Sequence, residues 1–244
     1  QNVNDIVVAA LEEGAEPSVL ACTDGWLVHC FSLAGERRWV TQIHHHAAKS
    51  LVVGDVDGDG RREILVGTEY HTSDLLESNG EVRWTIDGGP EFVALGFCDL
   101  DSDGIRESIY GTESGTVYGV HSLTGKILWK SNIGDRAHVA ATVTPGNENA
   151  LIVGSVCGEV ARLDATGRKI WRRNLGGEVI GVFASHHGVG VIAFTREGTV
   201  VRLGLSGWVE NRLDLKVYLA QVAPVSETEG PDTFFLAAGD RRIL

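Results

Sequence analysis

The sequence predicts an all-β fold, a β-propeller of about six four-stranded blades in which the last blade is incomplete. Three observations lead to this prediction. A glycine followed four residues later by tryptophan recurs every 40 to 45 residues, short apolar runs lie between the copies, and no helical periodicity of useful length is present. A repeat of this length built of short strands is typical of a propeller blade. The signature pairs are Gly35 with Trp39, Gly80 with Trp84, Gly125 with Trp129 and Gly167 with Trp171, and Gly207 begins a degenerate fifth copy.

The third repeat shows how each unit divides into strands. Phe92–Cys98 is the expected inner strand, Glu107–Thr112 the second and Thr116–His121 the third, and Lys126 begins the outer strand. The alternation of apolar and polar residues in the third strand fits a half-buried strand. Tight turns are expected where Gly follows a polar residue after the second strand, because Gly readily supplies a positive φ. These pairs are Asp24-Gly25, Ser114-Gly115 and Glu197-Gly198.

The repeats tile the chain as a single domain over residues 1–244. The expected units are 5–43, 46–87, 91–135, 137–176, 178–215 and 217–244. The sixth unit has Phe234–Ala238 as its second strand and stops within its third. Because a propeller must close and unpaired strands expose their edges, we expect either that the chain is truncated or that very short segments or a second chain complete the last blade. The chain contains no Met, which indicates that it was processed or excised from a longer one.

An acidic loop between the first two strands of the second unit predicts a calcium site. Asp55, Asp57 and Asp59 alternate, and Glu63 follows four residues later. So much negative charge in one loop repels itself unless a cation lies among the carboxylates. Oxygen ligands at loop positions one, three, five and nine suit a hard cation such as Ca²⁺, and the backbone carbonyl of Arg61 is expected as a further ligand.

The same loop recurs in the third unit, so about two structural calcium ions are expected. The alternative is two acidic turns without metal. An EF-hand is excluded because its twelfth loop position needs a bidentate acid, whereas that position is Val66 in one loop and Tyr110 in the other. The second set of ligands is Asp99, Asp101, Asp103, the carbonyl of Ile105, and Glu107.

Composition narrows the classes of partner. A net charge of −12 without a basic cluster argues against binding to nucleic acid or to an anionic membrane. No apolar run approaches the ~18 residues that a membrane span needs. The cysteines lack metal-type spacing and stand among apolar residues, which indicates buried small side chains, and a disulfide among them stays open. They are Cys22, Cys30, Cys98 and Cys157.

Ring-bearing side chains offer candidate binding groups. Three histidines and an acid fall in connections that lead into inner strands, where they could converge on a ligand or a transition metal. The alternative is a solvated loop with incidental histidines. The repeated tryptophans are expected to pack between neighbouring blades, whereas Trp26 follows a tight turn and lies off that pattern. The candidate ligand-binding residues are His45, His46, Glu91 and His138.

Two stretches resemble known propeller repeats. Residues 55–67, Asp-Val-Asp-Gly-Asp-Gly-Arg-Arg-Glu-Ile-Leu-Val-Gly, resemble the FG-GAP repeat of integrin α-subunit propellers, and similar loops occur in polysaccharide lyases of the rhamnogalacturonan type. Residues 115–129, Gly-Thr-Val-Tyr-Gly-Val-His-Ser-Leu-Thr-Gly-Lys-Ile-Leu-Trp, are similar to the blade repeat of pyrroloquinoline-quinone dehydrogenases and of the outer-membrane assembly lipoprotein propeller. The resemblance implies the calcium ligands named above, although the FG-GAP family usually has Asp where Glu63 and Glu107 stand. It also implies, by analogy, an extracytoplasmic or secreted setting, and it carries over no quinone or lyase chemistry.

The repeated residues are those that build strands and turns, and few of them are groups that could take part in catalysis. The expected function is therefore a non-enzymatic, calcium-stabilised binding or scaffold module with a protein or glycan partner on a propeller face. The alternative is an enzyme acting on polysaccharide, a lyase or hydrolase, with its site at the mouth of the channel. A pocket lined by His45, His46, Glu91 and His138 would favour the enzyme, whereas a flat or plugged channel mouth would favour the binding module.

Overall fold

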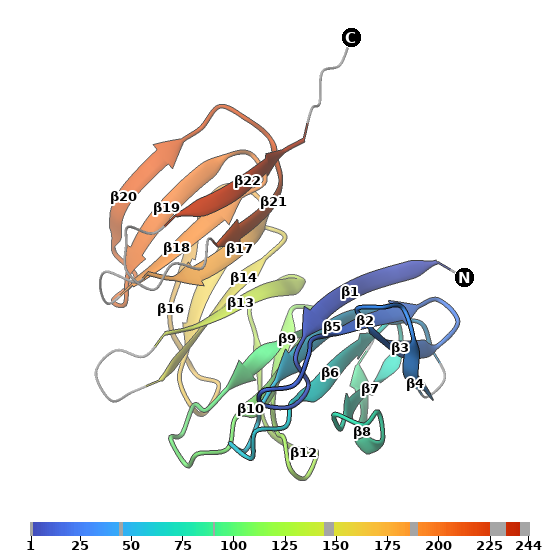
Figure 1. The fold of residues 1–244 in the computed structure, drawn as a ribbon. Helices are drawn as coiled ribbons and strands as arrows, with labels where there is room; N and C mark the ends of the chain where they lie inside the picture. The colour runs from blue at the N-terminus through green and yellow to red at the C-terminus, as the bar shows by residue number, and fades with distance from the viewer. Residues whose placement is uncertain are drawn as a thin grey trace. The chain divides into compact units, whose positions relative to one another are not determined.

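The computed structural model is built of strands, with no helix in the residues that it describes, namely 2–43, 46–89, 91–143, 149–185, 190–224 and 233–239. The strands form five four-stranded sheets and one two-stranded sheet (Figure 1). In each four-stranded sheet, strands that follow one another in the sequence are neighbours, as in a propeller blade. The predicted all-β fold of about six blades, the last incomplete, is confirmed. Within these ranges no helix is long and apolar enough to cross a membrane.

The chain divides into two compact units, residues 1–130 and 131–244. The first unit, coloured blue to green in Figure 1, holds three blades. The strands of its blades are β1 (Val3–Ala9), β2 (Ser18–Thr23), β3 (Leu27–Ser32) and β4 (Arg37–Gln42), then β5 (Ala48–Gly54), β6 (Glu63–Thr68), β7 (His71–Leu76) and β8 (Val82–Gly89), then β9 (Phe92–Cys98), β10 (Glu107–Thr112), β11 (Thr116–His121) and β12 (Lys126–Asn132).

The second unit holds two four-stranded blades and the two-stranded sheet. The predicted second strand of the last blade is confirmed as β22, and residues 240–244 lie outside the described part of the chain. The single domain over 1–244 and the completion of the last blade stay predictions. The strands are β13 (Ala137–Val143), β14 (Ala150–Ser155), β15 (Glu159–Leu163) and β16 (Lys169–Asn174), then β17 (Val179–Ala184), β18 (Gly190–Thr195), β19 (Thr199–Gly204) and β20 (Val209–Asp214), then β21 (Leu219–Pro224) and β22 (Phe234–Ala238).

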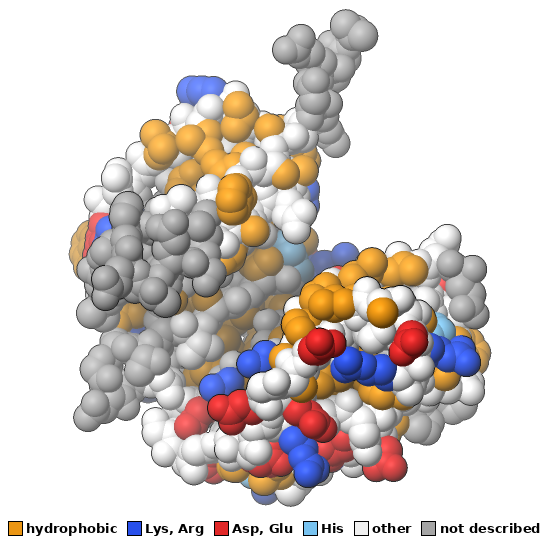
Figure 2. Space-filling model, in the orientation of Figure 1, with side chains coloured by type: hydrophobic (Ala, Val, Ile, Leu, Met, Phe, Trp, Pro, Cys, Tyr) orange, Lys and Arg blue, Asp and Glu red, His pale blue; other side chains and the backbone are white. Residues whose placement is uncertain are grey.

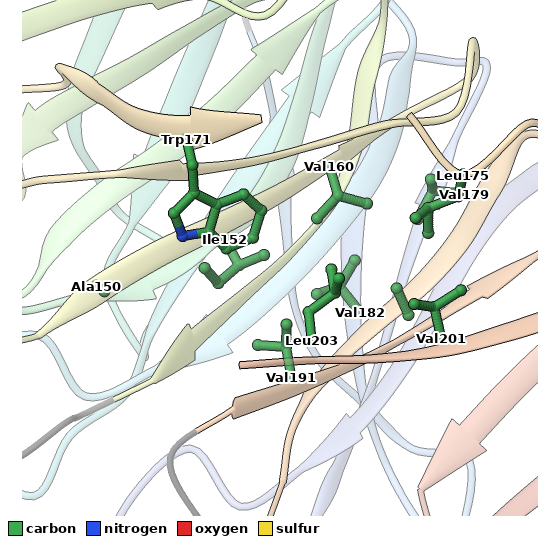
Figure 3. Packing of buried hydrophobic residues seen from close by; sticks show 11 residues of the cluster. Ala150, Ile152, Val160, Trp171, Leu175, Val179, Val182, Val191, Val201 and Leu203 are labelled. Carbon is green, nitrogen blue, oxygen red and sulfur yellow. The ribbon is translucent and has the colours of Figure 1, made fainter. Parts of the chain in front are cut away.

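The second strand of each four-stranded blade from β5 onward is buried along its whole length. Every residue of β6, β10, β14 and β18 is buried, which explains the apolar runs of β6, β14 and β18, whereas β10 also buries the polar residues Glu107, Ser108 and Thr112. Figure 3 shows one such packing layer in the second unit, where Ile152 of β14 and Val160 of β15 lie over Val182 and Leu203 of the following blade. Within each unit, neighbouring blades therefore bury their apolar surfaces against one another.

Tryptophans of the outer strands join neighbouring blades. A Cβ atom placed on Gly80 would lie 2.7 Å from the Trp39 ring, so only glycine fits beneath that ring. The Trp39 indole also donates from Nε1 to the carbonyl of Ser78 at 3.2 Å, in the same turn. The same packing recurs for Trp84 with Gly125 and Ser122, and for Trp171 with Gly207 and Leu205. The predicted packing between blades is thereby confirmed for three of the four repeated tryptophans, and for Trp129 it stays a prediction.

Two local expectations were wrong. The positive φ of the first hairpin turn belongs to Trp26 (63°) rather than to Gly25, because the register of the blade places Trp26 at the position that glycine holds elsewhere. Gly115 (78°) and Gly198 (87°) take that conformation as predicted. Cys157 is exposed in the turn between β14 and β15, whereas the other three cysteines are buried, and all four are free thiols.

Candidate functional site

The loop between β5 and β6 is folded by its own aspartates. Asp55 accepts hydrogen bonds from the backbone N–H groups of Gly58 (2.7 Å) and Gly60 (3.1 Å), and Asp59 accepts one from Arg61 (2.7 Å). Burial alone would raise the pKa of Asp55, but these backbone donors outweigh it and lower the pKa. The positive φ angles of Gly58 (77°) and Gly60 (84°) make the sharp turn that aims the carboxylates inward.

The loop between β9 and β10 repeats this arrangement. Asp99 accepts from the N–H of Gly104 at 3.1 Å, and Asp103 accepts from that of Ile105 at 2.7 Å. Ser102 stands where the first loop has Gly58, and it adopts a positive φ of 62°. The same loop geometry is therefore built twice, once with a side chain in the left-handed region.

The aspartates of each loop bring their carboxylate oxygens together. One oxygen from each of three aspartates lies within 4.8 Å of the others, in both loops. Figure 2 shows Asp and Glu side chains, with Lys and Arg among them, gathered on the visible face of the first unit. Three converging carboxylates are a donor set that fits Ca²⁺, whereas calcium itself and the carbonyl ligands Arg61 and Ile105 stay predictions. The carboxylates that would hold the ions are Asp55, Asp57 and Asp59, and Asp99, Asp101 and Asp103.

The glutamate at the ninth position closes each loop from inside the blade. Glu63 and Glu107 are 1% and 3% exposed. Glu63 accepts a hydrogen bond from the N–H of Val56 at 3.1 Å, and Glu107 accepts one from that of Leu100 at 2.8 Å. Burial raises the pKa of both carboxyl groups, and it raises that of Glu107 to about 7. Their role as metal ligands stays a prediction.

The two ninth-position glutamates have different neighbours on the outer strand. Arg83 of β8 donates to Glu63 at 3.0 Å and pairs with Glu77 at 2.5 Å. The residue before the signature tryptophan is Leu128 in the third blade, where the second blade has Arg83. The first loop therefore has a cation against its buried carboxylate, which the loop motif alone did not predict.

The first blade contains a signal that could have found Arg83. Arg38, which also precedes a signature tryptophan, donates to the hydroxyl of Ser18 at 2.7 Å. Ser18 begins β2 as Glu63 begins β6. An arginine before the tryptophan thus recurs in the first two blades, each time with a polar partner at the start of the second strand, and both arginines were visible in the sequence.

A polar cavity of about 460 Å³ opens beside the first loop, within the first unit. Charges of both signs line it, among them Glu13, Asp55, Arg62 and Arg106. Neighbouring loops are tied around it by backbone hydrogen bonds, for example from Arg106 N–H to the carbonyl of Val56 at 2.8 Å. The loops of three successive blades thus form one continuous surface.

The histidine candidates fall into the two units. His46 lies among aromatic rings of the first unit, with centroid distances of 5.2 Å to Tyr70 and 6.4 Å to Trp26. Glu91 directly precedes β9, and His45 lies outside the described residues. The predicted convergence of His45, His46, Glu91 and His138 stays a prediction.

His138 lies beside an ion pair in the second unit. Its Nε2 is 3.9 Å from a carboxylate oxygen of Glu178, which also accepts two hydrogen bonds from Arg196, one of them at 2.6 Å. The hydrogen bonds from Arg196 lower the pKa of Glu178, and burial lowers that of His138. The Arg196 guanidinium lies 5.9 Å from the centroid of the Tyr218 ring. The arrangement keeps Glu178 ionised and His138 neutral near neutral pH.

Comparison of the sequence with protein families identifies one match. Residues 8–144 and 113–206 match the family described as outer membrane protein assembly factor BamB. None of the curated proteins has a sequence that matches this chain.

Solved structures share the fold at low sequence identity. Saccharomyces cerevisiae Sqt1 is similar with a TM-score of 0.80 and 14% identity, over 98% of this chain and 70% of that chain. BBS1N in complex with ARL6DN has a TM-score of 0.73 and 11% identity, over 98% of this chain and 77% of that chain. A chain of the mitotic checkpoint complex has a TM-score of 0.71 and 13% identity, over 95% and 75%. At these identities the similarity concerns the fold alone.

Proposed function

Because the chain belongs to the family of the outer membrane protein assembly factor BamB, we propose that it is a β-propeller binding or scaffold module that holds a protein partner. The family match over residues 8–206 carries this proposal. The family is named for an assembly factor, and two of the similar structures are protein complexes. A propeller suits such a role because a regular frame of blades presents loops that are free to vary.

Calcium in the two acidic loops is the second part of the proposal. Each ion would neutralise three aspartates that otherwise repel one another and would pin the first strand of its blade to the second. The observation that supports it is the approach of the three carboxylates within 4.8 Å in both loops. An extracytoplasmic or secreted setting belongs to the same proposal, since loops of the FG-GAP kind are used where calcium is plentiful.

Metal analysis combined with thermal unfolding tests the calcium part. We expect about two calcium ions per chain, and at a calcium concentration of about 100 times Kd each site adds about 2.7 kcal/mol to the free energy of unfolding. Asp57→Asn and Asp101→Asn form a matched pair, each expected to lose one ion while keeping the other. Absence of bound calcium, together with a melting temperature that chelator leaves unchanged, would refute this part.

The binding part needs a purified partner and a titration. The full chain, immobilised with calcium, should capture a protein that then binds the free chain saturably and with fixed stoichiometry. A neutral oligosaccharide tested in parallel distinguishes a glycan-binding module. If captured proteins never saturate the free chain and the oligosaccharide does, the protein-binding function is wrong.

A further inference from the structure

The residue type at one turn position differs between the first two blades of the chain and the next three. In the turn between the second and third strands, the left-handed residue is Gly115, Gly158 and Gly198 in the later blades, with φ of 78°, 89° and 87°. In the first two blades that residue is Trp26, with φ 63°, and His71, with φ 51°. A side chain in this region costs free energy that glycine avoids. Large rings in this conformation, in two adjacent blades, indicate a use for those rings.

The two strained residues meet in one group of rings. His46 lies 6.4 Å from Trp26, 5.2 Å from Tyr70 and 6.3 Å from His71, measured between ring centroids. Tyr70 and His71 are 5.4 Å apart. We call Trp26, His46, Tyr70 and His71 the aromatic surface.

Backbone hydrogen bonds hold His46 between the two turns. The N–H of Ile43 donates to the carbonyl of Trp26 at 2.9 Å, and the N–H of Glu69 donates to the carbonyl of Ala47 at 3.0 Å. The connection that carries His46 is thus tied at one end to the first turn and at the other end to the second. The position of the rings relative to one another is therefore set by the backbone of two blades.

The aromatic surface is open to solvent. Trp26 is 42% exposed and Tyr70 is 50% exposed, and His71 is exposed as well. Burial of the Trp26 ring therefore offsets little of the strain in its backbone. Exposed tryptophan and tyrosine on a fixed backbone are typical of binding hot spots, because they offer large contact area at low entropic cost.

The edge of the aromatic surface is acidic. Asp24 and Glu69 each follow the second strand of their blade, in the same turns as Trp26 and Tyr70. Lys49 lies 3.6 Å from Asp24 and 3.9 Å from Glu69, so a cationic side chain already lies between these two carboxylates. Aromatic faces beside carboxylates complement a cation, because the ring quadrupole and the negative charge attract it together.

We propose that the aromatic surface binds an arginine or lysine side chain of a protein partner, stacked on Trp26 and Tyr70 with the carboxylate of Glu69 at its flank. The inference rests on the proposed function as a protein-binding module and names the surface that such a module would use. The net charge of −12 also favours a basic partner, because it attracts positive charge over a longer range than the contacts at the aromatic surface do.

The test is a titration followed by the NMR signals of the tryptophan indole N–H groups. The probe is N-acetyl-arginine methylamide, and the matched control is the citrulline analogue, which has the same shape without the charge. The Trp26 signal, identified by its absence in Trp26→Gly, should move saturably with the arginine probe and not with the citrulline probe. Glu69→Gln should weaken binding of the arginine probe by about fivefold. Equal responses to both probes, or a response to cellohexaose alone, would overturn the proposal, the latter in favour of a glycan surface.

Trp26→Gly and His71→Gly also serve as fold controls, because they restore the residue of the later blades. We expect both glycine variants to melt at or above the melting temperature of the natural chain. In Tyr70→Ala, which keeps the Trp26 signal, we expect that signal no longer to respond to the arginine probe. A clear drop in melting temperature for both glycine variants would identify the rings as packing groups and overturn the proposal. Capture of the same partner by Trp26→Gly and by the natural chain would refute the aromatic surface and leave the binding function standing. An arginine response without any saturable protein partner would support the aromatic surface and refute the proposed protein-binding function.

Discussion

The two acidic loops have the same aspartate spacing and nearly the same hydrogen bonds, yet they sit in different electrostatic surroundings. Each folds around backbone N–H groups that donate to aspartates, and each is closed by a buried glutamate. The first has Arg83 3.0 Å from Glu63, whereas the second has Leu128 at the equivalent position before the tryptophan. The first turns on glycine where the second turns on Ser102.

The difference shows that the loop motif specifies which acidic residues are present, whereas residues outside the loop affect the pKa of the buried glutamate. Burial, together with the charges of Asp101 and Asp99, raises the pKa of Glu107 to about 7. Burial also raises the pKa of Glu63, but the charge of Arg83 opposes that rise. Arg83, an outer-strand residue 20 positions from Glu63 in the chain, thus opposes the rise in pKa that burial causes in this carboxyl group.

The largest effect is expected for Arg83→Leu, which gives the first loop the neighbour of the second. It leaves Glu63 buried without its cation, and breaking a buried pair in this way costs about 3 kcal/mol. Urea unfolding of the calcium-free protein should show this loss at about pH 7. Leu128→Ala is the control at the equivalent site and should lose much less. A loss below about 1 kcal/mol for Arg83→Leu would mean that the pair contributes little and that the two loops are equivalent.

The pH dependence of the calcium-free protein should reveal the second loop. The folded chain keeps the Glu107 proton up to a pKa of about 7, against 4.5 ordinarily, so it binds more protons than the unfolded chain between these values. The contribution of Glu107 to stability is therefore present below about pH 4.5 and is lost as the pH rises through about 7. Relative to Glu107→Gln, the natural chain should lose about 2 kcal/mol between about pH 5 and pH 7.5. Parallel curves for the two proteins would contradict the raised pKa.

Leu128→Arg should bring the second loop closer to the first. A guanidinium near Glu107 favours the ionised carboxylate, and we expect a gain of about 1 kcal/mol at neutral pH. The pKa of Glu107, followed by carbon NMR of its carboxyl group, should fall. Leu128→Gln, which has the polarity without the charge, controls for the loss of an apolar side chain that is 41% exposed. An unchanged carboxyl titration would show that the position before the tryptophan does not govern the buried acid.

The smallest effect concerns the turn residue. Ser102→Gly should stabilise the second loop by about 0.5 kcal/mol, because glycine tolerates the φ of 62° that serine holds under strain. Gly58→Ser should cost a similar amount in the first loop, where a Cβ atom would meet nothing within 4 Å and the effect is purely conformational. Opposite signs for the two variants, measured by thermal unfolding, are the expected result. Equal signs would show that the loops differ in more than backbone strain.

The repeat pattern predicted most of the fold because its signals are local. Strand positions follow from apolar runs between turn residues, and the glycine and tryptophan signature marks each outer strand. The ion pair of Arg83 with Glu63 was missed, because it joins β6 and β8, which reach each other across β7 only after the blade has formed. The role of Trp26 was missed because Gly25 beside it satisfied the turn rule, and only the register of the strands shifts the positive φ by one residue. The aromatic surface depends on both turns and on the connection between them, which no single window of sequence contains.

The tryptophan that covers the turn glycine of the next blade bears on how such a protein grows during evolution. Trp39 and Gly80 lie in different repeats, and the second repeat carries both a covered glycine, Gly80, and a covering tryptophan, Trp84, which lies over Gly125. A duplicated repeat of this kind can therefore contact the blades on both sides through the same tryptophan and glycine pair. A gene can thus gain or lose such a blade without a new type of contact between blades. Substitution of a covered glycine, by contrast, disrupts the packing of a tryptophan in the preceding repeat. The residues tolerated in one repeat therefore depend on the repeat beside it.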